Sequence, residues 1–236
     1  MTVELAVFVD SSVYASLSQV LDHAEISDSI FALLNQAQAL FRLPSLGPRN
    51  LEFRLKKLEV HLRPPLELVS FNGQQLKILE SFCTYQASLN NPNPDAANYA
   101  PSWDLAVYLT GLDLWSDQGN FNTLGLANTE GICKPHYSCL VAEFGTHKSE
   151  TNNPYPAAGF GAGFILAHEI GHALGMRHDD FYGCDQVNTY FFYLQSSFKI
   201  DSNNCGTKDI SWRLSEFYFF KSTVSFPIMD LAANAI

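Results

Sequence analysis

HEIGHALGMRHD, residues 168–179, has the most informative residue spacing in this 236-residue sequence. It contains three of the seven histidines in the chain. If the segment is helical, His168 and His172 lie one turn apart on one face and can both reach a single metal ion. Two neutral imidazoles suit Zn²⁺. Glu169, next to the first ligand, is then placed to act as general base for a zinc-bound water.

Gly175 and His178 complete the predicted metal site. Glycine readily adopts a positive φ, so the chain can leave the helix sharply at Gly175 and bring His178 back toward the ion. Three protein ligands and one open position are typical of a catalytic zinc site rather than a closed structural one. The alternative is that the histidines lie on the helix without binding a metal. It does not account for the glycine and the third histidine at these spacings.

Strands alternate with helices in the residues before this motif. Apolar alternation predicts strands over 3–10 and 51–62, and an apolar run predicts an interior strand over 104–112. Helical spacing predicts one long helix over about 13–41, a second ending near 88, a third over 159–175 and a fourth over about 212–221. Residues 115–156 contain only short apolar runs. We therefore predict an α/β fold in one domain, 1–236, with an α/β lobe (1–175) and a smaller irregular lobe (176–236).

The composition favours a packed globular protein and argues against several classes of partner. Hydrophobic residues make up 47% of the chain, which is ample for a core. A net charge of −10 argues against binding nucleic acid or an anionic membrane. No apolar run reaches eighteen residues, so we expect no membrane span. The first ten residues lack a signal-peptide pattern, so we expect either a mature domain or an excised fragment.

The motif HExxHxxGxxHD resembles that of the metzincin metallopeptidases, and Asp179 after the third histidine resembles the adamalysin (reprolysin) branch. The segments 81–90, 103–114 and 122–145 are similar, in this order, to segments of ADAMTS catalytic domains. The resemblance covers most of the chain. It implies a metzincin fold, in which a mixed twisted sheet with long helices carries a zinc-binding active-site helix and a small irregular C-terminal lobe follows.

The resemblance also gives partners to four of the five cysteines, none of which lies in a CxxC pair. It implies disulfides Cys83–Cys139 and Cys184–Cys205. Cys133 is left without its partner, because the chain has PIMD at 227–230 where the family has a cysteine. The competing expectation is five reduced thiols in a cytosolic protein.

Structural calcium is a further implication of the resemblance, since hard oxygen ligands bind Ca²⁺. Glu4, Asp104 and Asp230 match one family site, and Asp113, Thr123 and Glu143 match parts of a second. The alternative for each acid is a solvated surface charge.

The resemblance implies a secreted, extracellular zinc endopeptidase that acts on proteins, including those of the extracellular matrix. Gln195 stands where metzincins carry a methionine in a turn beneath the zinc. The chain also lacks the partner of Cys133 and a small disulfide that the family has around Ser116 and Phe121. These changes and Gln195 motivate the alternative function, a weak or inactive metzincin-fold domain that binds proteins as a decoy.

Overall fold

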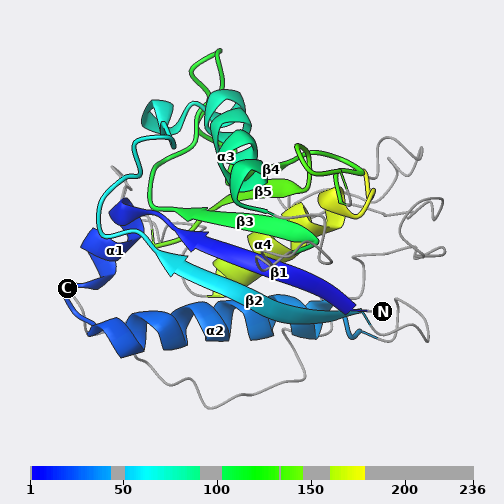
Figure 1. Cartoon of the computed structure of the whole chain (residues 1–236), viewed down its shortest axis with the longest axis horizontal. Coiled ribbons are helices and arrows are strands. Elements are labelled where there is room, and N and C mark those ends of the chain that lie inside the picture. The colour runs from blue at the N-terminus through cyan, green and yellow to red at the C-terminus, as the bar shows by residue number, and fades with distance from the viewer. Residues whose placement is uncertain (1, 44–50, 91–102, 133, 146–159, 179–236) are drawn as a thin grey trace, which may run out of the picture.

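A computed structural model of the chain describes residues 2–43, 51–90, 103–132, 134–145 and 160–178. These residues form a five-stranded sheet packed between helices (Figure 1). Helices α2 (His23–Leu40) and α4 (Phe160–Ala173) cover one face of the sheet, and α3 (Gln75–Leu89) covers the other. The predicted α/β class is confirmed.

The sheet is mixed, as expected, and its strands have the order β2-β1-β3-β5-β4. The strands are β1 (Thr2–Val9), β2 (Glu52–Val60), β3 (Leu105–Thr110), β4 (Gly125–Ala127) and β5 (Cys139–Glu143). β1 pairs in parallel with β2 and β3, β3 pairs in parallel with β5, and β4 runs antiparallel to β5. β3 and β5 are buried along their whole length, which explains their apolar character in the interior of a parallel sheet.

Alternating side chains of β1 build the two halves of the core. Leu5, Val7 and Val9 belong to the cluster under α2 and α4, whereas Ala6 and Phe8 belong to the cluster under α3. Successive side chains of a strand point to opposite faces, so this single strand anchors helices on both sides.

The single helix predicted over 13–41 is wrong, because the segment forms two helices, α1 (Ser11–Leu17) and α2. Asp22 starts the second helix with a capping box. Its carboxylate accepts a hydrogen bond from the Glu25 backbone N–H (2.9 Å), and the Glu25 carboxylate accepts one from the Asp22 N–H (2.8 Å). Apolar spacing continues across this break, so periodicity alone does not reveal it.

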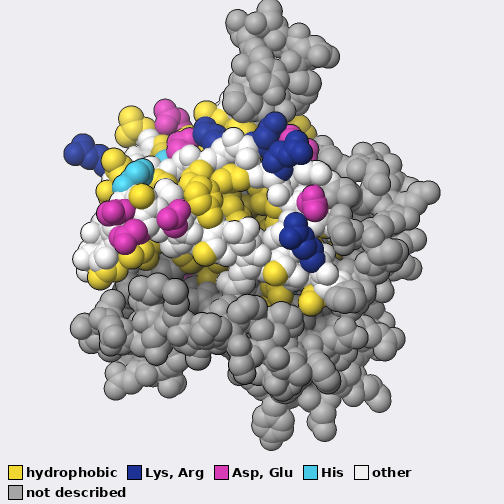
Figure 2. Space-filling model, turned by 90° about the horizontal axis from the view of Figure 1, so that it is seen from below, with side chains coloured by type: hydrophobic (Ala, Val, Ile, Leu, Met, Phe, Trp, Pro, Cys, Tyr) yellow, Lys and Arg dark blue, Asp and Glu magenta, His cyan; other side chains and the backbone are white. Residues whose placement is uncertain are grey.

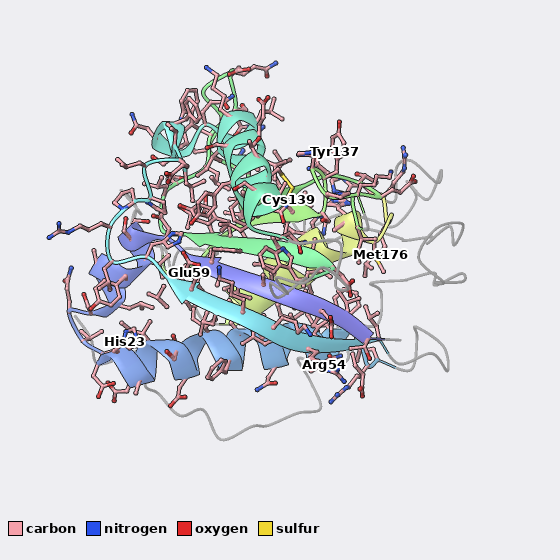
Figure 3. The ribbon with its side chains drawn as sticks, viewed as in Figure 1. His23, Arg54, Glu59, Tyr137, Cys139 and Met176 are labelled. Atoms are coloured by element: carbon pink, nitrogen blue, oxygen red, sulfur yellow. A yellow bond between two sulfur atoms is a disulfide. The ribbon has the colours of Figure 1, made fainter. Side chains whose placement is uncertain are left out.

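α3 begins after the short 3-10 helix η2 (Phe71–Gly73) and is joined covalently to the sheet. The Gln74 side chain caps α3 by accepting a hydrogen bond from the Lys77 N–H at 2.7 Å. A disulfide between Cys83 and Cys139 links α3 to the first residue of β5, and Figure 3 shows it beside the labelled Cys139. The implied pairing of these two cysteines is confirmed.

Some of the predictions from the sequence fall outside the described residues. They concern the helix at 212–221 and the residues Cys133, Cys184, Gln195, Cys205 and Asp230. The smaller lobe predicted over 176–236 is described only for its first three residues.

The surface on the α2 side carries charges of both signs (Figure 2). Basic and acidic side chains are interspersed with hydrophobic ones over the described part of this face. None of the described helices combines the length and the apolar character that a membrane span requires.

Candidate active site

α4 is a largely apolar helix that carries a few polar side chains. Leu166, Ile170 and Ala173 are fully buried in the core shared with α2 and the sheet. Gly163 lets α4 approach α2 closely, because a Cβ at this position would collide with the side chain of Gln36. Packing on both sides fixes the helix, and with it the polar side chains that it carries.

The three predicted ligands meet at one point. The Nε2 atoms of His168 and His172 are 2.9 Å apart, those of His172 and His178 are 3.0 Å apart, and those of His168 and His178 are 3.2 Å apart. Ligands at about 2.0–2.1 Å in tetrahedral directions would have nitrogens about 3.3–3.4 Å apart. The donor type and the convergence of these atoms therefore fit a zinc ion.

The exit from the helix has the form predicted from Gly175. This residue has φ +97°, and its N–H donates to the carbonyl of His172 at 2.8 Å. The next N–H, of Met176, donates to the carbonyl of Gly171 at 2.9 Å. This pair of bonds is a Schellman motif, which reverses the chain and brings His178 to the other two histidines.

Met176 also fixes the proton position on one of the three histidines. Nδ1 of His172 lies 2.7 Å from the Met176 carbonyl oxygen, and Figure 3 labels Met176 beyond the end of α4. A carbonyl can only accept, so Nδ1 carries the hydrogen and Nε2 keeps its lone pair for a metal. Burial lowers the pKa of His172, and burial together with the other two rings lowers the pKa of His168 to about 3. Both rings are therefore in the neutral form that binds metals.

Glu169 is a buried carboxyl on a helix that has no other acidic residue. It is only 5% exposed, and burial raises its pKa to about 8. Burial disfavours the charged form, so this carboxylate holds a proton more tightly than a surface carboxylate does. In its ionised form such a buried carboxylate is a stronger base than one at the surface, and Glu169 directly follows the predicted ligand His168 in the chain.

The loop after β4 caps the end of α4, which sequence reasoning missed. The Glu130 N–H donates to the carbonyl of His172 at 3.0 Å, and the Ile132 N–H donates to that of Ala173 at 3.1 Å. Glu130 has a positive φ of 59°, and its carboxylate lies 3.6 Å from Arg177. The last carbonyls of a helix lack intrahelical donors. The Ile132 N–H supplies one to Ala173, and the Glu130 N–H gives the His172 carbonyl a second donor besides the Gly175 N–H. No periodic pattern in this loop signals its role.

Two residues of the first expected calcium site are neighbours. The Glu4 N–H donates to Oδ2 of Asp104 at 2.9 Å, and the Asp104 N–H donates to the carbonyl of Glu4 at 2.8 Å. The Glu4 carboxylate also lies 3.3 Å from Lys56 and 3.6 Å from Arg54. The structure brings Glu4 and Asp104 together, and the third residue lies outside the described ranges.

Residues that follow two members of the second expected calcium site contact its third member, Glu143. The N–H of Leu114, the residue after Asp113, donates to Oε1 of the buried Glu143 at 2.6 Å. The Glu143 N–H donates to the carbonyl of Leu124, the residue after Thr123, at 2.9 Å. Backbone contacts thus bring the chain at Asp113 and Thr123 to Glu143.

Comparison with known proteins identifies the family. The profile of metallo-peptidase family M12 (Reprolysin_5) matches residues 1–207. "A disintegrin and metalloproteinase with thrombospondin motifs adt-1" of Caenorhabditis elegans is 31% identical over 184 residues, which is 75% of this chain and 11% of the relative. Human "A disintegrin and metalloproteinase with thrombospondin motifs 15" is 32% identical over 182 residues, which is 76% of this chain and 17% of the relative. This chain therefore spans less than a fifth of the length of either relative.

Archaemetzincin from Methanopyrus kandleri is a solved structure with a TM-score of 0.40 and 14% identity, covering 80% of this chain and 82% of that one. The family match supports the metzincin fold expected from the resemblance. The chain belongs to metallo-peptidase family M12 and is a metzincin of the adamalysin and ADAMTS type.

Proposed function

We propose that the chain is the catalytic domain of a secreted endopeptidase in which Glu169 is the general base. The observation that carries this proposal is the convergence of three imidazole Nε2 atoms within 3.2 Å, beside a buried glutamate on the same helix. His168, His172 and His178 would hold the ion. When bound, zinc supplies Lewis acidity that polarises a peptide carbonyl and makes water a stronger acid.

Glu169 would perform the proton transfers. Its carboxylate accepts a proton from the attacking water and later gives that proton to the leaving amine nitrogen. Burial raises the pKa of Glu169 in the metal-free chain. A bound zinc cation would lower that pKa again and favour the carboxylate, which is the form that accepts a proton.

The Cys83–Cys139 disulfide supports the proposal of secretion, since disulfides persist in oxidising compartments. The substrates proposed are extracellular proteins, including those of the matrix.

Structural calcium is proposed at the site of Glu4, Asp104 and Asp230 and at that of Asp113, Thr123 and Glu143. A rise in the unfolding temperature on adding Ca²⁺ to chelator-treated protein would support it, and no rise would contradict it.

The test of the activity uses the purified chain, a generic unfolded protein substrate and a zinc chelator. We expect cleavage that stops with chelator, returns with added Zn²⁺ and is inhibited by a hydroxamate. A chain that binds Zn²⁺ with one-to-one stoichiometry but cleaves nothing would contradict the proposal and favour the decoy function.

A further inference from the structure

We propose that Gly125, in the edge strand β4, positions the carboxyl group of Glu169 by leaving open the space that this side chain fills. The inference rests on the proposed function of Glu169. Gly125 would be a positioning residue, because it acts on the reaction only through the glutamate.

The contact distances at Gly125 show why a side chain does not fit. A Cβ at this position would lie 2.6 Å from Cγ, 2.8 Å from Oε1 and 2.9 Å from Cδ of Glu169. Carbon atoms in van der Waals contact are about 3.5–4.0 Å apart. All three close atoms belong to Glu169, so a substitution here meets the proposed base itself.

The backbone does not require glycine at this position. Gly73, Gly119, Gly145 and Gly175 are the described glycines with positive φ, and Gly125 is not among them. Alanine would therefore adopt the backbone conformation of Gly125 without strain. The constraint on residue 125 is the space that the Glu169 side chain occupies, not the backbone conformation.

β4 is held in place, so the glutamate side chain must yield. Gly125 pairs with Ala142 of β5 in the antiparallel ladder at the edge of the sheet. Just before it, the Leu124 carbonyl accepts a hydrogen bond from the Glu143 N–H at 2.9 Å. Glu169 is 5% exposed, which leaves its carboxyl little room to move aside.

Displacing the general base should lower kcat more than it changes KM. A shift of about 1 Å in a catalytic group can cost on the order of 100-fold in rate. The three atoms nearest the space at residue 125 all belong to Glu169 and none to a histidine, so the metal site itself should persist.

The first test is Gly125→Ala. We expect kcat to fall about 10- to 100-fold with KM changed less than about threefold and one zinc retained per chain. Gly119→Ala is the control, because a Cβ there meets nothing within 4 Å. The positive φ of Gly119 costs this control some stability, but it should keep the wild-type kcat. Wild-type kcat in Gly125→Ala would overturn the inference.

The second test is a double-mutant cycle in the unfolding temperature. Gly125→Ala should lower this temperature in the wild-type background and leave it unchanged in Glu169→Ala, where the occupied space is vacated. An equal fall in both backgrounds would overturn the inference. If the wild-type chain cleaves nothing, the proposed function fails, but this cycle still tests the contact between Gly125 and Glu169.

Discussion

Helices α3 and α4 pack on opposite faces of one sheet, but they contribute differently to the protein. α3 buries Ile78 and Phe82 and is tied to β5 by a disulfide. α4 is more deeply buried and carries the half-buried His168 and His172 as well as the buried Glu169. Buried polar groups cost stability unless they find partners. α3 is held to the sheet covalently, whereas α4, which packs in the larger of the two hydrophobic clusters, also carries the reactive groups.

Removing a metal ligand should have the largest effect on the α4 side. We expect His172→Ala to lose bound zinc and all detectable hydrolysis, because two ligands remain where a catalytic zinc site has three. Zinc content by atomic absorption and a peptide-cleavage assay measure both. The exposed His136 provides the control, and His136→Ala should keep full activity. Wild-type activity in His172→Ala would contradict the assignment of His172 as a zinc ligand.

Removing the disulfide should separate the contributions of α3 and α4, because it destabilises the fold without changing any residue of the predicted zinc site. The bridge spans 56 residues, so the double substitution Cys83→Ala and Cys139→Ala should lower the free energy of unfolding by about 4 kcal/mol. Urea unfolding measures the change. Zinc content and activity per folded molecule should stay near wild type. Loss of zinc from the folded variant would show that the two faces are not separable.

A smaller effect is expected from Glu59, which lies on the α3 side. Burial raises its pKa, but hydrogen bonds from Lys57 and His61 and their charges outweigh burial, so the net pKa is lowered. Its stabilising contribution is therefore present above the unfolded value of 4.5 and is lost as the pH falls through the lower folded value. The difference in unfolding temperature between wild type and Glu59→Gln should shrink below about pH 4. If the difference in unfolding temperature between wild type and Glu59→Gln did not change with pH, the lowered pKa of Glu59 would be contradicted.

Sequence patterns predicted the parts of this structure that depend on local spacing. α4, its glycine exit and the meeting of three histidines follow from spacing, and the buried β3 follows from an apolar run. The capping box at Asp22 was missed, although Asp22 and Glu25 carry its signal. β4 and β5 were not predicted, because they have three and five residues and their pairing is non-local. The role of Gly125 has no local signal at all, since it depends on a contact with a side chain of α4.

The central claim is that Glu169 is the proton acceptor of a zinc site built by three histidines. Glu169→Gln tests it most directly, because glutamine keeps the shape of the side chain and removes the basic oxygen. We expect kcat to fall about 10²–10⁴-fold, with zinc content and unfolding temperature close to wild type. Wild-type kcat in a zinc-loaded Glu169→Gln variant would contradict it.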